Sequence, residues 1–321
     1  MTLAQLQSFV TVARLGSVKA AAAALGVTEP AISDAVRVLR SELGDELYIR
    51  AGGGIELTTG GERLAAAAGE ILGLAEQARR SVREARGESA VLRVAASEAV
   101  AEFAAGPLLD AFTRRNSGIE ITLQVAPGHA FAALLSDRLA DVALGPRAER
   151  EGATGIESVP FLRYVVAVVA APGHHLARRR DIAPAALARE AWFVGPAGTD
   201  PTTATGAFLK HHGLSPRDLL AFPSYAAARA QVAAGRGVTL ALVHTIQDEL
   251  ERGALVRLDV RGTPFTRLWY ASMLAPDRRT APAWALRRFV ATAEATQALL
   301  ARAGGVPAER FRPPVHVTLW S

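Results

Sequence analysis

The stretch that decides the fold is Ser17-Val18-Lys19-Ala20-Ala21-Ala22-Ala23-Ala24-Leu25-Gly26-Val27-Thr28-Glu29-Pro30-Ala31-Ile32-Ser33. Its pattern predicts two short helices joined by a sharp turn. We expect the Ser17 hydroxyl to cap the first helix and the Thr28 hydroxyl the second, because both residue types accept hydrogen bonds from unpaired amides at helix starts. Gly26 falls where the turn needs a positive φ, which glycine adopts without strain.

The second helix of this pair has two different faces. Helical spacing predicts an inward face made of Ala31, Ile32, Ala35, Val36 and Leu39. The outward face then holds Ser33, Asp34, Arg37 and Arg40. A helix presented after such a turn is the device that lays side chains in the major groove of DNA. The alternative interpretation is an ordinary helical hairpin, which the segments on either side of the motif disfavour.

The flanking segments complete a winged helix-turn-helix. Residues 3–15 predict an amphipathic helix whose buried side consists of Leu3, Leu6, Phe9, Val10 and Ala13. Residues 46–50 and 55–58 predict two short strands around the turn Gly52–Gly54, and such a wing can rest on the DNA backbone. Arg50 is its best phosphate contact, although an ordinary surface arginine is an equal alternative.

A long helix is expected from Thr59 to about Arg86. An apolar seam runs along it at spacings of three and four: Leu64, Ala68, Ile71, Ala75, Ala78, Val82 and Ala85. Such a seam requires a partner helix, and we expect a second copy of the chain to supply it. The helix is roughly 40 Å long at ~1.5 Å per residue. A dimer would hold two reading helices for half-sites about one DNA turn, ~34 Å, apart.

From residue 91 the pattern changes to strands alternating with helices, which predicts a parallel sheet covered by helices. The strands of a first set are expected at 91–96, 119–125 and 141–145. A second set begins near Tyr164, and the strand 267–274 returns to the first. The fold class is therefore α/β overall, with an N-terminal winged helix-turn-helix, a long linker helix and a C-terminal two-lobed domain like the periplasmic binding proteins. The expected domains are 1–58, 59–88 and 89–302, with a tail at 303–321.

Composition narrows the class of protein. The chain has 321 residues, no cysteine and a formal charge of +5. The DNA-binding interpretation does not rest on that charge, because residues 1–58 carry five basic and six acidic residues, or −1. The longest apolar run, 164–171, is only strand-sized, and the N-terminus lacks a signal-peptide profile. We therefore expect a cytoplasmic protein with no membrane association.

The sequence offers no recognisable catalytic or cofactor motif. It has no nucleophile elbow, P-loop or dinucleotide fingerprint, so we expect no enzyme activity and no cofactor. The adjacent pairs His174-His175 and His211-His212 are interpreted as surface-loop and helix-end residues. We see no acid at metal-site spacing from either pair, and expect no metal site.

The chain resembles the LysR-type transcriptional regulators over about residues 2–300. The most specific part is Ala-Ala-x-x-Leu-Gly-Val-Thr-x-Pro-Ala-Ile-Ser, followed by Leu43-Gly44, Leu47-Tyr48-x-Arg50 and Leu57-Thr58-x-x-Gly61. The resemblance implies a double-stranded DNA operator, a small-molecule effector and a homodimer or homotetramer, formed by a dimer through the linker helix and a dimer of dimers. The DNA-binding residues it implies are Thr28, Glu29, Pro30, Ser33, Asp34, Arg37, Arg50 and Thr58. Glu29 stands where the family commonly has glutamine, so it reads a base or simply faces the helix dipole.

The effector site is expected between the two lobes, at strand ends and helix N-termini. The candidate residues are Ser97, Glu98, Gly128, His129, Thr199, Asp200 and Thr202. For any one of them, helix capping is the more economical role. The resemblance adds that relatives often carry an arginine where this chain has Asp200, which argues against a simple carboxylate effector.

Three functions are compatible with these patterns. The leading hypothesis is a DNA-binding regulator controlled by an effector. The second is an effector-independent DNA-binding regulator whose α/β half serves only oligomerisation. The third is an enzyme or solute-binding protein with an accidental helix-turn-helix, which the missing catalytic motif and signal peptide disfavour.

Overall fold

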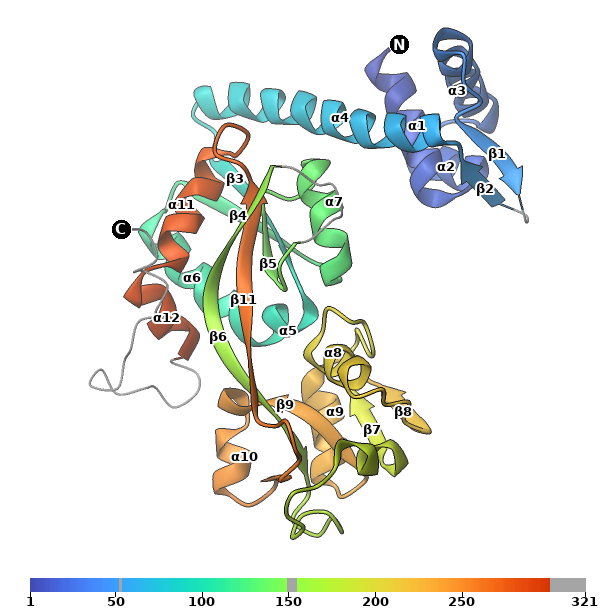
Figure 1. The fold of residues 1–321 in the computed structure, drawn as a ribbon. Coiled ribbons are helices and arrows are strands. Elements are labelled where there is room, and N and C mark those ends of the chain that lie inside the picture. Colours follow the sequence, from blue (N-terminus) through green and yellow to red (C-terminus); the bar gives the residue numbers. More distant parts are fainter. Residues whose placement is uncertain (52–53, 149–154, 301–321) are drawn as a thin grey trace. The chain divides into compact units, whose positions relative to one another are not determined.

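A computed structural model describes residues 1–51, 54–148 and 155–300 of the chain (Figure 1). The chain divides into two compact units, one of residues 1–89 with 133–139, the other of the remaining residues. Each unit has its own core and is described by itself. The turn residues Gly52 and Gly53 and the tail expected at 303–321 lie outside the described residues.

The N-terminal unit is a winged helix-turn-helix followed by a long helix. Its elements are α1 (Leu3–Leu15), α2 (Val18–Leu25), α3 (Glu29–Leu43), β1 (Tyr48–Ala51), β2 (Gly54–Leu57) and α4 (Thr59–Ala85). Both expected caps are present: the Ser17 hydroxyl accepts from the Ala20 N–H at 3.3 Å, and the Thr28 hydroxyl from the Ala31 N–H at 3.4 Å. Gly26 has φ 65°. The antiparallel pair β1–β2 forms the wing.

The core of this unit differs from the expected one at three positions. Leu3 and Ala31 are exposed, whereas Val12 is buried. Arg40 does not face away from the unit. Its guanidinium lies 4.4 Å from the centre of the Tyr48 ring and donates to the Tyr48 carbonyl at 2.9 Å, so it holds α3 to the wing.

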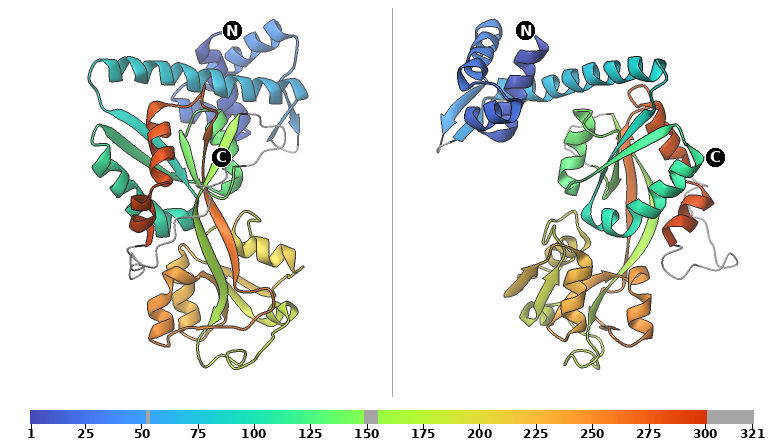
Figure 2. Two further views of the ribbon diagram at one scale, coloured as in Figure 1. Left: turned by 60° about the vertical axis from the view of Figure 1, so that its left-hand side comes forward. Right: turned by 180° about the vertical axis from the view of Figure 1, so that it is seen from behind.

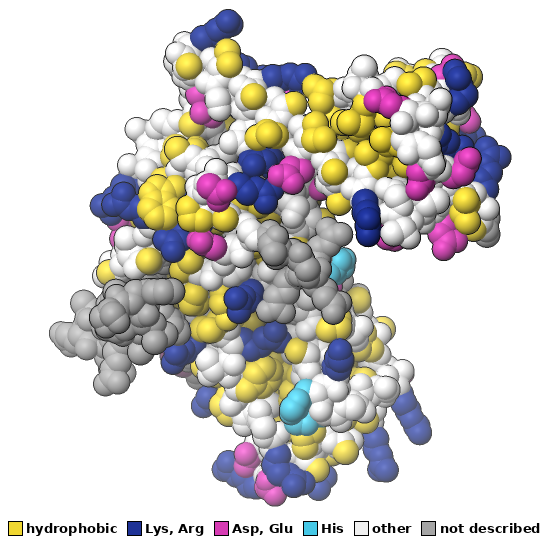
Figure 3. Space-filling view, turned by 45° about the horizontal axis from the view of Figure 1, so that its top comes forward, with side chains coloured by type: hydrophobic (Ala, Val, Ile, Leu, Met, Phe, Trp, Pro, Cys, Tyr) yellow, Lys and Arg dark blue, Asp and Glu magenta, His cyan; other side chains and the backbone are white. Residues whose placement is uncertain are grey.

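Helix α4 uses its apolar seam in two ways. Near its start Leu64 and Ala68 pack into the core that α1 and α3 form, so this part of the expected seam is not open to a partner copy. Further along, the seam residues Ile71 and Val82 are 39% and 55% exposed, and Leu74, which was not part of the expected seam, is 51% exposed. They are separated by three and eight residues, which places them on one face of the helix. Hydrophobic side chains are visible on the surface of this unit in Figure 3.

The C-terminal unit is built on one mixed sheet, not a purely parallel one. The strand order is β4-β3-β5-β11-β6-β9-β7-β8, with β10 beside β6. The strands are β3 (Ala90–Ala96), β4 (Ile119–Val125), β5 (Val142–Gly145), β6 (Ile156–Ala170), β7 (Ala191–Val194), β8 (Asp218–Ala221), β9 (Val238–Leu242), β10 (Val256–Arg257) and β11 (Phe265–Leu274). The expected strands 91–96, 119–125, 141–145 and 267–274 match β3, β4, β5 and β11 to within two residues. The strand expected near Tyr164 begins at Ile156, and β8 and β10 were not expected.

The helices of this unit cover the sheet. They are α5 (Glu98–Val100), a π-helical turn (Ala101–Ala105), α6 (Gly106–Arg115), α8 (Ala204–His211), α9 (Tyr225–Ala233), α10 (Gln247–Glu251), α11 (Ala281–Val290) and α12 (Ala293–Leu300). Helix α7 (Phe131–Ser136) crosses the division between the two units. Short 3-10 turns lie at Gly128–Ala130, Pro184–Arg189 and Val243–Thr245. The π-helical turn lies directly before α6 and carries Glu102 and Phe103.

Two long antiparallel strands join the two lobes of this unit, as Figure 2 shows. Lobe 1 is formed by β3, β4, β5 and the end of β11, and lobe 2 by β7, β8, β9 and the end of β6. The pairing of β6 with β11 runs from Ile156 opposite Leu274 to Val166 opposite Phe265. Because both strands run through both lobes, the cleft between the lobes has a continuous floor.

Candidate functional site

The exposed side of α3 carries the expected DNA-facing residues. Ser33, Asp34 and Arg37 are all exposed. Asp34 and Arg37 form an ion pair with 3.2 Å between Oδ1 and Nη2, although both side chains remain largely exposed, at 69% and 73%. A pair so open to water is weak, so the Arg37 guanidinium can turn to a phosphate or a base and the Asp34 carboxylate to a base amino group.

The wing and the start of α2 form a hollow beside that helix. Its lining includes Ser17, Lys19, Glu29 and Arg50. Helix α2 has no acidic residue in its first turn, and its N-cap is the neutral Ser17 hydroxyl, so its positive end is open. This hollow therefore combines a helix N-terminus, two cations and the single carboxylate of Glu29, a net positive chemistry that suits a backbone phosphate.

Thr58 is placed differently from the other expected DNA-binding residues. Its hydroxyl accepts from the Gly61 N–H at 2.9 Å and donates to Asp45 Oδ1 at 2.7 Å. The Thr58 hydroxyl and the Leu47 N–H lower the pKa of the Asp45 carboxyl. Thr58 thus caps α4 and fixes the base of the wing.

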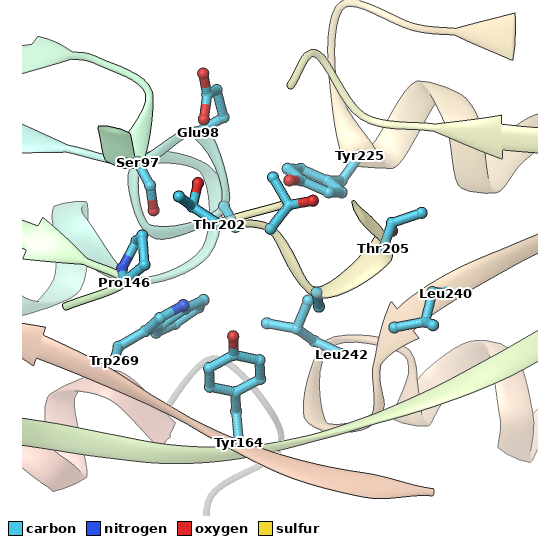
Figure 4. Close-up of a pocket in the computed structure, with 14 residues that line it drawn as sticks. Ser97, Glu98, Pro146, Tyr164, Thr202, Thr205, Tyr225, Leu240, Leu242 and Trp269 are labelled. Carbon is cyan, nitrogen blue, oxygen red and sulfur yellow. The ribbon is translucent and has the colours of Figure 1, made fainter. Parts of the chain in front are cut away.

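The second candidate site is a cavity between the two lobes of the C-terminal unit (Figure 4). Its free volume is small, about 30 Å³, within about 530 Å³ of non-atom space that includes open solvent. Four expected effector-binding residues line it: Ser97, Glu98, Gly128 and Thr202. The Ser97 side chain, which the sequence could assign to helix capping, makes no capping hydrogen bond. Its hydroxyl is buried without a partner, and Figure 4 shows it directed into the cavity.

The other three expected residues lie outside the lining. His129 is 69% exposed, and its Nδ1 lies 2.8 Å from Asp200 Oδ2, so the pair joins lobe 1 to lobe 2 beside the cavity. Burial alone would raise the pKa of Asp200, but the hydroxyl and N–H of Thr202, together with His129, outweigh it and lower that pKa. Thr199 is exposed, and Thr203 caps α8.

Much of the cavity wall comes from residues that the sequence did not single out as binding residues. They are Ala99, Pro146, Tyr164, Thr203, Ala204, Thr205, Tyr225, Leu240, Leu242 and Trp269. Tyr164 and Trp269 come from β6 and β11, the two strands shared by the lobes, and their ring centres are 4.6 Å apart. The alternation of these strands places every second side chain on the cleft side, but only the pairing register shows which ones.

A second contact joins the lobes on the other side of the cavity. Glu102, in the π-helical turn of lobe 1, accepts from the Tyr225 and Ala226 N–H groups, each at 2.8 Å. These are the first two residues of α9 in lobe 2. The Phe103 and Tyr225 rings lie 5.8 Å apart beside it. The lobes are therefore held together on either side of the cavity.

The expectation that no acid lies near His174 and His175 was wrong. Glu190 lies 3.3 Å from the Nε2 atom of His174 and 3.1 Å from that of His175. All three ligand atoms lie within 4.8 Å of one another, a spacing that could hold a metal ion. However, His174 Nδ1 accepts from the Leu176 N–H, so its neutral ring carries the proton on Nε2 and donates it to Glu190. Burial lowers the pKa of His174, which Glu190 opposes.

Comparison with known proteins identifies the class. Residues 3–62 match the bacterial regulatory helix-turn-helix protein, lysR family, and residues 85–295 match the LysR substrate binding domain. The chain therefore belongs to the LysR family of transcriptional regulators, which bind DNA and are not enzymes. No helix within the described ranges has the length and apolar character to cross a membrane.

Individual relatives agree with this assignment. An uncharacterized HTH-type transcriptional regulator of Mycobacterium tuberculosis is 39% identical over 323 residues, covering all of both chains. Full-length CbnR complexed with its target DNA has a TM-score of 0.55 at 22% identity, over 90% of this chain and 99% of that one. The CcmR regulatory domain of Synechocystis in complex with 2-PG has a TM-score of 0.53 at 24% identity, over 68% of this chain and all of that one. The last two likenesses show the fold.

Proposed function

We propose that this regulator binds its operator with the exposed face of α3 and with the wing. The proposed DNA-binding residues are those named from the sequence, with Arg50 on a phosphate and Ser33 and Arg37 toward the bases. The observation that supports this assignment is that Ser33 and Arg37 are exposed on α3 and that Arg50 lines the hollow. Thr58 contributes by fixing the wing. Since the partner is DNA, we place the protein in the cytoplasm of a bacterial cell.

The exposed stripe on α4 supports a dimer. Ile71, Leu74 and Val82 present an unpartnered apolar face within the described chain. Two copies that pack along this stripe would hold two α3 helices for the two halves of an operator. A dimer of such dimers would give the tetramer. We keep the units at 1–58, 59–88 and 89–302 as the proposed functional division.

We further propose that the cavity between the lobes binds a small effector that controls DNA binding. The buried, unpartnered hydroxyl of Ser97 supports this function, because a buried polar group without a partner costs about 1–3 kcal/mol and is relieved by a ligand. A ligand that favours one arrangement of the lobes shifts the population of that arrangement. The alternative is a regulator that needs no effector and uses these lobes only for assembly.

The DNA assignment is tested by binding-site selection with the full-length protein. The wild type should enrich a sequence with two half-sites. Arg37→Ala should relax the base preference at one position of each half-site. Arg217→Ala is the matched control, because Arg217 is an exposed arginine in the C-terminal unit. An unchanged preference in Arg37→Ala would remove α3 as the reading helix.

The effector is tested separately. A ligand that binds only the folded protein must raise its melting temperature. Thermal shift of the full-length protein against a metabolite panel should therefore find stabilising compounds whose effect is lost in Ser97→Val, which removes the unpartnered hydroxyl from the cavity wall. The effector-independent alternative predicts that no compound stabilises the protein through this cavity.

A further inference from the structure

Two buried glycines lie in the middle of the alanine-rich helix α4. Gly69 and Gly73 are four residues apart and therefore share one face of the helix. Glycine in a helix interior is less stable than alanine, so these positions serve something other than helix formation. A Cβ atom at Gly73 would lie 2.3 Å from the carbonyl oxygen of Asp137 and 2.6 Å from the Cβ of Arg138. At Gly69 it would lie 2.5 Å from an Asp137 carboxylate oxygen, so only glycine admits this contact unchanged.

The segment that packs on this glycine face is 133–139, the end of α7 and the turn after it. It belongs to the same compact unit as α4. The N–H groups of Arg138 and Leu139 donate to the carbonyls of Leu135 and Leu134, at 3.0 and 2.8 Å, and Arg138 has a left-handed φ of 52°. Such a helix end usually carries glycine at the left-handed position. An arginine persists there only where its surroundings hold it.

Side chains fasten the same turn to two helices. The Arg138 side chain is buried, and its Nη1 donates to Gln77 Oε1 on α4. Asp137 Oδ2 lies 3.6 Å from the Nη2 atom of Arg14 on α1. We call segment 133–139 the clamp. It contacts α4 over two helical turns, from residue 69 to residue 77, and reaches α1 as well.

The clamp leaves the exposed stripe of α4 open. Ile71 is two residues from both Gly69 and Gly73, which places it about 200° around the helix from each. Val82 is nine residues from Gly73, or about 180° around the helix from it. A second copy can therefore pack on the stripe while the clamp stays on the opposite face.

The other end of α7 starts at the cavity between the lobes. The 3-10 turn Gly128–Ala130 runs directly into α7, and Gly128 lines the cavity. The Phe131 ring, fully buried at the start of α7, lies next to Ser97: a Cβ atom at Gly145 would be 2.9 Å from the ring and 2.8 Å from the Ser97 hydroxyl. Because α7 has only six residues, it connects the cavity wall to the clamp within a short stretch of chain.

Resting on the proposed effector function, we propose that the clamp is the element through which the cavity controls α4. A shift of Gly128 or Phe131 moves α7. Since closely packed groups transmit a displacement, α4 must follow the clamp or lose its contact with it. Either result changes how the α3 helices are presented to the two half-sites. Gly69, Gly73 and Gln77 are positioning residues, which act on α4 and touch neither DNA nor the effector.

The test replaces the effector with a methyl group built into the cavity wall. A Cβ atom at Gly128 would lie 2.4 Å from Pro146 Cγ and 2.8 Å from Thr202 Oγ1, so Gly128→Ala forces the wall to shift where a ligand would press on it. The operator affinity of the full-length protein is measured by fluorescence anisotropy at fixed salt. We expect Gly128→Ala to change the Kd about fivefold or more in the otherwise wild-type chain.

The same substitution is then measured with the clamp displaced. Gly73→Ala sets a methyl group against the backbone of Asp137, which cannot turn aside as a side chain can. Alanine also favours the helix, so α4 stays intact. In the Gly73→Ala background we expect Gly128→Ala to change the Kd less than about twofold, because residues that act through one contact are not additive.

Two further variants make this result specific. Gln77→Ala removes the hydrogen bond from Arg138 but keeps the glycine face, and we expect it to reduce the effect of Gly128→Ala partly. Gly106→Ala is the matched control, because no atom lies within 4 Å of the added Cβ at the start of α6. It should leave the full effect of Gly128→Ala in place.

The outcomes separate this inference from the function on which it rests. If Gly128→Ala and a second cavity variant, Ser97→Val, both leave operator affinity unchanged, the cavity does not control DNA binding, and the proposed function and the clamp fail together. If Gly128→Ala has its full effect in the Gly73→Ala background, control by the cavity stands and only the clamp is contradicted.

Hydrogen–deuterium exchange of each variant shows that the clamp has moved in a folded chain. In Gly73→Ala we expect faster exchange in 133–139 and unchanged exchange in α1 and α3. If Gly73→Ala is unfolded by this measure, Gln77→Ala takes its place. An undiminished effect of Gly128→Ala in the Gln77→Ala background then overturns the proposal.

Discussion

The two units of this protein use their carboxylates in opposite ways. In the N-terminal unit the three acids of α3, Glu29, Asp34 and Glu42, are exposed, and the start of α2 has a neutral cap beside Lys19. In the C-terminal unit, Glu102 accepts from the first two N–H groups of α9, and Asp200 accepts from the Thr202 N–H in the turn before α8. The formal charge of +5 does not reveal this difference. Affinity for an anion depends on which positive helix ends are left open: Glu102 occupies the start of α9, whereas the start of α2 has only a neutral cap.

The largest expected effect concerns a buried carboxylate of the C-terminal unit. The Asp141 side chain is 5% exposed and accepts from the Arg93 N–H, Nε and Nη2 at 2.9, 3.1 and 2.9 Å. Asp141→Ala leaves the guanidinium without its partner and should lower the free energy of unfolding by about 3 kcal/mol. Urea denaturation followed by tryptophan fluorescence measures it, since Trp192, Trp269 and Trp284 all lie in this unit. Asp34→Ala, the exposed counterpart, should change stability by less than about 0.5 kcal/mol.

Glu102 should have the next largest effect. Glu102→Ala removes two charge-assisted hydrogen bonds from the start of α9 and should lower the free energy of unfolding by about 2 kcal/mol in the same assay. Glu120→Ala provides the control. If both variants unfold at the same urea concentration as the wild type, Glu102 does not hold the lobes together.

A single substitution places a carboxylate at the start of α2, as Glu102 does at the start of α9. Aspartate is as good an N-cap as serine, so Ser17→Asp should keep α2 intact while placing a negative charge at its open end. Repulsion of the DNA backbone should weaken operator binding about tenfold, or ~1.4 kcal/mol. Fluorescence anisotropy at fixed salt measures the affinity. Ser17→Asn, a neutral cap, should bind like the wild type, and equal loss in both variants would point to geometry instead of charge.

The smallest effect is a pH dependence at Asp200. Because its folded-state pKa is lowered, the charged carboxylate contributes stability above the ordinary pKa of 3.8, and that contribution is lost as the pH falls through the lower folded value. The Asp200→Asn variant has no carboxylate at this position and therefore lacks this contribution to stability. Urea midpoints should therefore fall more steeply with acid below about pH 4 in the wild type than in the variant. Parallel curves would show that Asp200 gains nothing from Thr202 and His129.

The features that could be predicted from the sequence are mainly local. Ser17, Thr28 and Gly26 act on neighbouring amides and turns, so three or four residues suffice to place them. The spacing of apolar residues could not tell which part of the α4 seam is buried in the unit and which part is exposed, because Ala68 and Val82 follow the same periodicity. Only the tertiary fold shows that Ala68 packs on α1 and α3.

The cavity also shows that only local features could be predicted from the sequence. Ser97 and Thr202 could be found because they stand at strand ends or helix starts, where ligand sites gather. Tyr164 and Trp269 look like ordinary core residues in the sequence, and they reach the cavity through the pairing of β6 with β11. Glu102 contacts Tyr225 across 123 positions of chain. No local pattern predicts a contact at that separation.

The most direct test of the division between the two units is hydrogen–deuterium exchange of the full-length protein with and without its selected operator. We predict slower exchange on DNA binding in the α2, α3 and wing segments, 17–37 and 48–57. Amides that surround the cavity, 97–103 and 200–206, should not be protected by direct contact with DNA. Protection confined to the cavity segments, with α2, α3 and the wing unchanged, would contradict this division of roles.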